Sequence, residues 1–206
     1  MSRNDSLLIT LKKYMPEGGA EYAHEILWKY GIQLHIKKPR RTKLGDYRPP
    51  RPGEPHRVSI NNDLNPYAFL VTFLHEAAHL VNFEKNGFKV MPHGSEWKQE
   101  FHSISQPVLH AHILPEKVLF ALDRYLKNPK ASSCTDPFLY RTLKHFDIQK
   151  DNTLLVEEVP MGARFNIGDG RIFVKQERLR SRYRCLEVKT NKSYLVPGLM
   201  EVEILP

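Results

Sequence analysis

The chain has 206 residues, of which 41% are hydrophobic and 26% charged, with a mean hydropathy of -0.48 and a net charge of +8. This balance is typical of a soluble globular protein and excludes disordered, fibrous and coiled-coil classes. The most apolar stretch, residues 67–81, contains two histidines, a threonine and a glutamate, and the first residues offer only a short apolar run. Neither a membrane span nor a secretory signal is therefore predicted.

Cysteine is rare, since the chain has only Cys134 and Cys185. Two isolated cysteines cannot form a disulfide framework or a four-cysteine zinc site. We therefore expect a reducing, cytoplasmic environment. Cys185 is expected to be a small buried hydrophobic residue and Cys134 to lie in a linker.

The positive charge is concentrated in two segments. Residues 37–57 contain eight Lys or Arg and two acidic residues, and residues 164–192 contain nine and three, so each segment carries +6. We interpret both segments as surfaces that contact phosphate groups, which makes DNA a candidate partner. An ordinary solvated surface is the alternative.

Three elements are predicted in the first third of the chain. Residues 21–30 carry apolar side chains at helical spacing and are followed by Gly31, which favours a helix. Residues 33–37 and 57–61 alternate apolar and polar side chains, which indicates two short strands. The segment between these strands holds five prolines and most of the first basic segment, so we interpret it as a loop.

A long helix is predicted next. Asn65 is a favourable N-cap, Pro66 suits the first helical position, and Gly87 is typical of a helix end. Two further helices are expected over residues 95–104 and 115–127, where apolar side chains recur at helical spacing.

The last quarter of the chain has the pattern of short strands separated by turn sequences such as Gly-Asp-Gly and Pro-Gly. The predicted strands are residues 154–159, 163–167, 171–175, 182–188, 193–196 and 200–204. We therefore divide the chain into a helical domain with a small sheet at residues 1–128, a linker at 129–153 and a β module at 154–206.

The predicted long helix contains the sequence His75-Glu76-Ala77-Ala78-His79, an HExxH motif. Histidines four residues apart share one helical face, so both imidazoles can bind one metal ion with Glu76 beside them. The flanking residues are apolar, which indicates a buried, rigid helix of the kind that a preorganised zinc site requires. A chance occurrence on a structural helix is the alternative.

A catalytic zinc needs a third protein ligand and one open position. The metzincin spacing is excluded, because the chain has Asn82 and Lys85 where that pattern requires glycine and histidine. A glutamate on the next helix is one candidate, Glu100 more so than Glu96. The other candidate is His93, which lies just before that helix. The spacing leaves this choice open.

Several sequence motifs occur in a characteristic order in the first half of the chain. HEAAHL is followed by HGSEWK, and the segments RTKLGDYRP and RVSINNDL precede both. As a set, these motifs resemble the SprT-like family of zincin metallopeptidases, which includes the Spartan DNA–protein crosslink proteases. The similarity covers residues 20–130.

The resemblance implies an α+β fold, with a zincin-like helical protease domain whose small antiparallel sheet presents one strand, between residues 32 and 60, to the substrate. It implies one Zn2+ per chain, with His75, His79 and His93 as ligands and Glu76 as the general base. In that mechanism zinc polarises the scissile carbonyl and lowers the pKa of its water to about 7. Glu76 takes the water proton and passes it to the leaving amine.

The C-terminal module departs from the family pattern. Many SprT-like proteins carry a zinc ribbon with two cysteine pairs after the protease domain, and this chain lacks those pairs. Residues 180–185 and 192–196 resemble the strands of such a ribbon without its ligands. We therefore expect a small all-β module, resembling a degenerate zinc ribbon, that is held by packing and binds no second zinc.

These observations favour a zinc-dependent endopeptidase that acts on DNA-associated proteins, as in DNA repair, and that contacts DNA through residues 37–57 and 164–192. The alternative is a zinc-containing DNA-binding or accessory factor without proteolytic activity. The intact HExxH motif favours the enzyme, because a structural zinc site has no need of Glu76 and is usually closed by four ligands.

Overall fold

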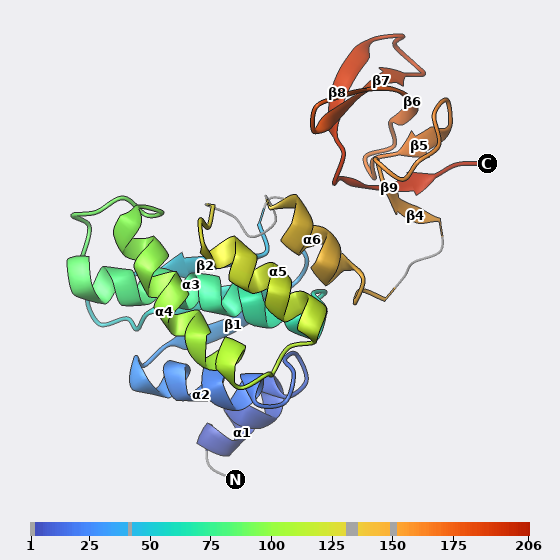
Figure 1. Cartoon of the computed structure of the whole chain (residues 1–206). Helices are drawn as coiled ribbons and strands as arrows, with labels where there is room; N and C mark the ends of the chain where they lie inside the picture. Colours follow the sequence, from blue (N-terminus) through green and yellow to red (C-terminus); the bar gives the residue numbers. More distant parts are fainter. Residues whose placement is uncertain (1–2, 41–42, 131–135, 149–151) are drawn as a thin grey trace. The chain divides into compact units, whose positions relative to one another are not determined.

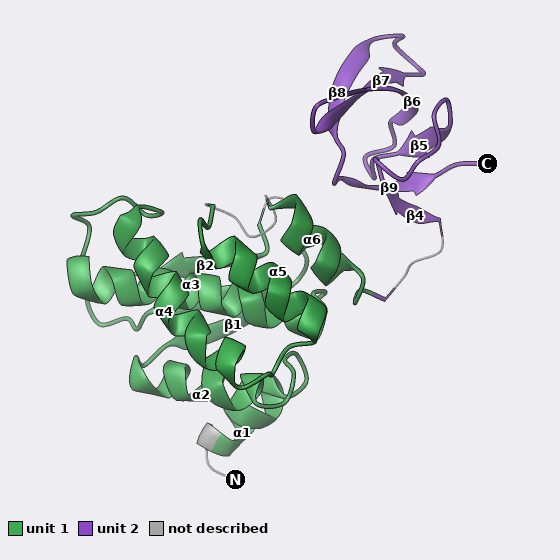
Figure 2. Ribbon diagram, viewed as in Figure 1, with its two compact units in different colours: residues 1–147 green, residues 148–206 purple. Residues whose placement is uncertain are grey.

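The described residues of this computed structural model are 3–40, 43–130, 136–148 and 152–206. The chain divides into unit 1, residues 1–147, and unit 2, residues 148–206 (Figure 2). Cys134 lies outside the described residues, and so does Arg41 of the first basic segment. Among those that are described, no helix is long and apolar enough to cross a membrane.

Unit 1 is mixed α+β, with helices and a small sheet (Figure 1). Its described elements are α1 (Arg3–Leu11), α2 (Gly19–Lys29), β1 (Gln33–Lys37), β2 (Gly45–Arg48), β3 (Arg57–Asn61), α3 (Pro66–Asn86), α4 (Ser95–His110), α5 (Glu116–Leu126) and α6 (Pro137–Lys144). The predicted helices and both predicted strands are confirmed, with α4 longer than expected. Elements α1, β2 and α6 lie where no element was predicted.

Helix α3 is the centre of unit 1, and its ends are those that the sequence predicts. Asn65 Oδ1 accepts hydrogen bonds from the backbone N–H groups of Tyr67 and Ala68, at 3.1 and 3.0 Å. At the other end, Gly87 caps the helix with a φ of 59°. The helix contacts α2, α4, β2 and β3, and most of its side chains are buried. The HExxH motif therefore lies on a rigid, packed element.

The sheet of unit 1 has the order β1-β3-β2. Strand β2 pairs with β3 in antiparallel fashion, but β1 pairs with β3 in parallel. The expectation of an antiparallel sheet is thus wrong for one of its two strand pairs. The physical reason is that the chain turns back through β2 before β3 begins, so β3 runs in the same direction as β1.

Unit 1 extends beyond residue 128, because α6 occupies part of the segment expected to be a linker at residues 129–153. The side chain of Asn65 also donates hydrogen bonds to the carbonyl of Leu143, at 2.9 Å, and to Asp147 Oδ1, at 2.6 Å. The buried side chains of Leu139 and Leu143 join the same core as α3. These contacts attach α6 to the helical core.

Unit 2 is a single six-stranded antiparallel sheet with the order β4-β9-β5-β6-β7-β8. Its strands are β4 (Thr153–Leu155), β5 (Arg164–Asn166), β6 (Ile172–Leu179), β7 (Arg182–Glu187), β8 (Ser193–Pro197) and β9 (Glu201–Ile204). Each predicted strand has a counterpart, so the all-β character of the C-terminal region is confirmed. Cys185 is fully buried and free, as expected. The resemblance to a zinc ribbon stays a prediction.

Candidate metal centre

Three histidines converge at the C-terminal half of α3. His75 and His79 lie on successive turns of this helix, and His93 lies just before α4. Their candidate ligand atoms all lie within 4.8 Å of one another. Within the described parts of the chain, this is the one group of three or more such side chains that could hold a metal ion.

The separation of two of the nitrogens fits a tetrahedral metal ion. His75 Nε2 and His79 Nε2 are 3.3 Å apart. Two nitrogens that bind one zinc at ~2.0–2.1 Å with tetrahedral angles are separated by ~3.3–3.4 Å. In addition, His93 Nε2 is buried without a hydrogen-bond partner among the described residues. A shared cation would satisfy this nitrogen and would use the lone pairs of the other two.

The electrostatic environment keeps these imidazoles neutral. Burial lowers the pKa of His75 to about 3, and the neighbouring His79 and His93 add to the effect. Burial, with a smaller contribution from His93, lowers the pKa of His79 to about 4, and burial also lowers the pKa of His93. Only a neutral imidazole offers a lone pair to a metal, so the three side chains are in the form that binds.

Trp97 of α4 holds the three imidazoles in place. Its ring stacks on His79 with centroids 5.2 Å apart, and it meets the rings of His75 and His93 edge-on, at 4.8 Å each. Trp97 is fully buried and belongs to the helical core. The sequence does not show that the tryptophan forms the wall of the histidine cluster.

Glu76 lies outside this cluster and faces strand β2. A Cβ atom added to Gly45 would lie 2.6 Å from Glu76 Oε1 and 2.7 Å from Thr72 Cγ2. Burial raises the pKa of Glu76 to about 8, and Asp46 adds to the increase, whereas a backbone hydrogen bond from Tyr47 acts in the opposite direction. The carboxyl group is therefore held between α3 and β2, beside the imidazoles but not among them.

The two glutamates considered as third ligands are engaged elsewhere. Glu100 Oε1 accepts from Lys85 Nζ at 2.7 Å, and Glu96 Oε2 accepts from the Ser95 hydroxyl at 3.1 Å. Neither belongs to the group that could hold a metal ion. The geometry therefore brings His93, and neither glutamate, to the two histidines of the motif.

A hydrogen-bonded network attaches β2 to α3 near the site. The Tyr47 hydroxyl lies 2.9 Å from His56 Nδ1, and His56 Nε2 lies 3.1 Å from Glu84 Oε1. An imidazole with its proton on Nε2 would donate to Glu84 and accept from the tyrosine hydroxyl at Nδ1. The ring of Phe83 packs against both aromatic rings. Strand β2 is thus fixed against the helix that carries Glu76.

Sequence reasoning missed the contribution of β2. The alternation of small or apolar and charged residues from Gly45 to Arg48 is a strand signal, but a proline-rich, basic context surrounds it. Gly45, followed by the alternating residues 46–48, could have indicated an edge strand, because a glycine in a strand often marks a close approach to another element.

Together, the fold and the site define an α+β unit with a buried HExxH helix and a three-histidine cluster that could bind a metal ion. Residues 20–116 match the model of the SprT-like family. Unit 1 therefore contains a SprT-like domain, and the resemblance noted in the sequence is confirmed. The match spans a little under half of the chain and ends before α6 and unit 2. Neither a curated protein nor a solved structure matches.

Proposed function

We propose that unit 1 is a zinc-dependent endopeptidase of the HExxH type with a zincin-like active site. The observation that carries this proposal is the convergence of His75, His79 and His93, with Glu76 held beside them against β2. Membership of the SprT-like family supports it, since that family is associated with metallopeptidase-type activity.

The three imidazoles would hold the metal and leave a fourth position open. Zinc bound in this way supplies a Lewis acid and makes water a nucleophile at neutral pH. His79 and His93 are only partly buried, whereas His75 is buried. The side of the cluster that includes His79 and His93 is therefore the side that solvent and substrate can reach.

Glu76 is the general base in this proposal. In its ionised form the carboxylate accepts a proton from the attacking water and passes it to the leaving amine. The burial that raises its pKa makes the carboxylate a stronger base, and a nearby dication favours the ionised form. The hydrogen bond from the Tyr47 backbone fixes the position of the carboxylate.

Strand β2 is the edge on which we place the substrate. The backbone N–H of Asn61 donates to the carbonyl of Leu44 at 2.9 Å, so residue 44 faces β3 in the antiparallel ladder. Alternation then turns the backbone groups of Gly45 and Tyr47 away from β3. The Tyr47 N–H already donates to Glu76, so an extended peptide would pair with the remaining groups of this edge and pass next to Glu76.

We also propose that the substrates are DNA-associated proteins. In the second basic segment, all of the arginines are exposed, as a surface for phosphates requires. Among the other basic residues of this segment, Lys175 is not available to a phosphate. It is buried, and its ammonium group donates to the carbonyls of Glu157 and Val159. Tyr183 is buried too and packs in the core of unit 2.

Proteolysis is tested with zinc-loaded wild-type protein and the Glu76→Gln variant, each incubated with a DNA-bound protein in the presence and absence of DNA. We expect cleavage by the wild type and a loss of about 10²–10⁴-fold in the variant, because the amide cannot accept the proton. Equal cleavage by both proteins would show that Glu76 is not the base. No cleavage by either, with zinc bound, would favour the non-proteolytic DNA-binding factor.

A further inference from the structure

A pocket of about 520 Å³ opens on the polar face of the sheet of unit 1. Five of its nine lining residues are lysine or arginine and one is acidic. These charged residues are Lys37, Lys38, Arg40, Arg48, Arg57 and Asp46. Neither the histidine cluster nor Glu76 lines this pocket, so it is distinct from the metal centre.

Strand alternation separates the pocket from the metal centre. On β3, Val58 and Ile60 are fully buried in the helical core, so Arg57, Ser59 and Asn61 point to the opposite face. The register then places charged and polar residues of all three strands in rows on that face. His35 and Asp46 flank Ser59, and Arg48 lies opposite Arg57.

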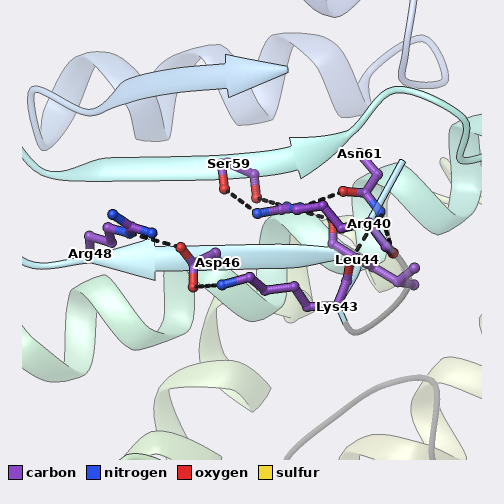
Figure 3. A network of polar contacts seen from close by, with 7 residues as sticks. All are labelled: Arg40, Lys43, Leu44, Asp46, Arg48, Ser59 and Asn61. Atoms are coloured by element: carbon purple, nitrogen blue, oxygen red, sulfur yellow. Dashed lines mark hydrogen bonds and ion pairs between the residues drawn. The ribbon is translucent and has the colours of Figure 1, made fainter. Parts of the chain in front are cut away.

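The floor of the pocket is a preorganised polar network (Figure 3). Arg40 Nε donates to Asn61 Oδ1 at 2.7 Å, and Arg40 Nη1 donates to Ser59 Oγ at 3.0 Å. The second terminal nitrogen of Arg40 lies 3.3 Å from both the Leu44 and Ser59 carbonyls. The guanidinium group is thus held in place by neutral acceptors and keeps its full positive charge.

The single carboxylate does not neutralise the pocket. Asp46 accepts from Lys43 at 2.7 Å and from Arg48 at 3.0 Å, so it is shared between two cations (Figure 3). Lys37 and Lys38 are exposed and have no acidic partner among the described residues. Arg57 Nη2 pairs with Glu54 Oε2 at 3.0 Å, so the lining cations without a carboxylate partner in the described chain are Arg40, Lys37 and Lys38, and these attract anions.

Two polar atoms of the lining residues also lack partners. Both His35 Nε2 and Arg57 Nε are buried without a hydrogen-bond partner within the described chain. A buried polar atom without a partner is destabilising, and a hydrogen bond from a bound ligand would remove that cost. Burial, together with Lys37 and Arg57, lowers the pKa of His35, so the imidazole is neutral and offers either a donor or an acceptor.

We propose that this pocket binds a phosphate ester of about nucleotide size. Its volume lies within the range of about 300–1,000 Å³ that is typical of small-ligand sites and exceeds what a phosphate ion alone would fill. Arginine side chains can donate two parallel hydrogen bonds to phosphate oxygens, and lysine ammonium groups add compact positive charge, so together they suit a phosphate group. The ester comes either from a free nucleotide or from a single strand of nucleic acid, whose flexible backbone can enter a concave site.

Binding is measured by fluorescence anisotropy with a labelled single-stranded oligonucleotide, in the Glu76→Gln background so that the result does not depend on peptidase activity. Binding measurements with a labelled mononucleotide and with inorganic phosphate distinguish a free nucleotide from a single strand of nucleic acid as the source of the ester. Lys37→Glu is the test variant. Lys117→Glu on α5 is the control, because it changes the net charge equally at an exposed site outside the pocket.

We expect Lys37→Glu to weaken binding about tenfold and to reduce the salt slope by about 0.7–1, with little effect of Lys117→Glu. Arg57→Lys, which keeps the charge but loses the Nε donor, should weaken binding by a smaller factor. In a labelled protein, the Arg57 Nε–H resonance should shift on addition of the nucleotide. Equal losses in the two charge-reversal variants, tighter binding of a glutamate-rich peptide, or an unshifted Arg57 signal would overturn the proposal.

Discussion

Substitution of Gly45 by alanine tests the contact between β2 and Glu76. The added Cβ would lie 2.6 Å from Glu76 Oε1, 2.7 Å from Thr72 Cγ2 and 2.8 Å from Glu76 Cγ. Carbon atoms pack best at about 3.5–4.0 Å, so β2 or the glutamate must move by about 1 Å. Overpacking of this kind lowers the free energy of unfolding by about 1–3 kcal/mol. Alanine also reduces the conformational entropy of the unfolded chain, which offsets about 0.4–1 kcal/mol of that loss.

The larger effect of Gly45→Ala is expected on catalysis. A displacement of about 1 Å at a reacting group can cost about 10²-fold in rate, so kcat/KM should fall by about that factor. The zinc content should stay at the wild-type level, because the three atoms nearest the added Cβ belong to Glu76 and Thr72 rather than to a histidine.

Gly19→Ala is the matched control for this substitution. Its added Cβ would meet the end of the flexible Leu70 side chain at 2.8 Å, within unit 1 but away from Glu76. We expect a change in stability with wild-type kcat/KM. The two variants are compared by thermal unfolding, metal analysis and peptide cleavage. Full activity of Gly45→Ala, or an equal loss in both variants, would refute the placement of β2 against the base.

Three further predictions concern the protonation and packing of buried groups. Folding lowers the pKa values of two histidines strongly and raises that of one carboxyl, Glu76, so the histidines outweigh it and the metal-free fold should lose stability as the pH falls from about 6.5 toward 4, where the unfolded chain binds more protons. Zinc affinity, measured against a competing chelator, should for the same reason persist below pH 6.5; a steep fall that begins at that pH would contradict the lowered values. In unit 2, Lys175→Met should lower the free energy of unfolding by about 1–3 kcal/mol, because two backbone carbonyls lose their donor. Unchanged or higher stability in a denaturant titration would show that burial of the charge outweighs those bonds.

Local signals made the ends of α3 predictable. Asn65, Pro66 and Gly87 act within one turn of the helix, so their effect does not depend on the rest of the fold. The same holds for the strands of unit 2, where turn sequences and alternation are short-range. The HExxH spacing likewise fixes His75 and His79 on one face without knowledge of any neighbour.

The remainder of the site depends on tertiary contacts. Strand β2 is defined by its pairing with β3, and the meeting of Gly45 with Glu76 joins residues remote in the sequence. The same is true of Trp97, whose contacts with the imidazoles require α4 to pack across α3. By contrast, the start of α6 carried a readable signal that was missed, because Asp136 caps the helix and proline follows it.

Burial of Lys175 illustrates a different limit. Alternation along β6 places it on the same face as Phe173, toward the core, but a lysine at such a position normally indicates an exposed face. Only the tertiary structure supplies the two carbonyl acceptors and the ring of Tyr183, whose centroid is 4.2 Å from the ammonium nitrogen. The net charge of the second basic segment therefore includes one cation, Lys175, that is not on the surface and cannot contact phosphate.

The zinc content of purified protein is the most direct test of the three-histidine site. Elemental analysis should give one zinc per chain in the wild type and in the variants Glu76→Gln and Glu100→Ala. It should give far less than one in His93→Ala, because the two remaining imidazoles cannot hold the ion tightly. A full complement of zinc in His93→Ala, or its loss in Glu100→Ala, would contradict the assignment of His93 as the third ligand.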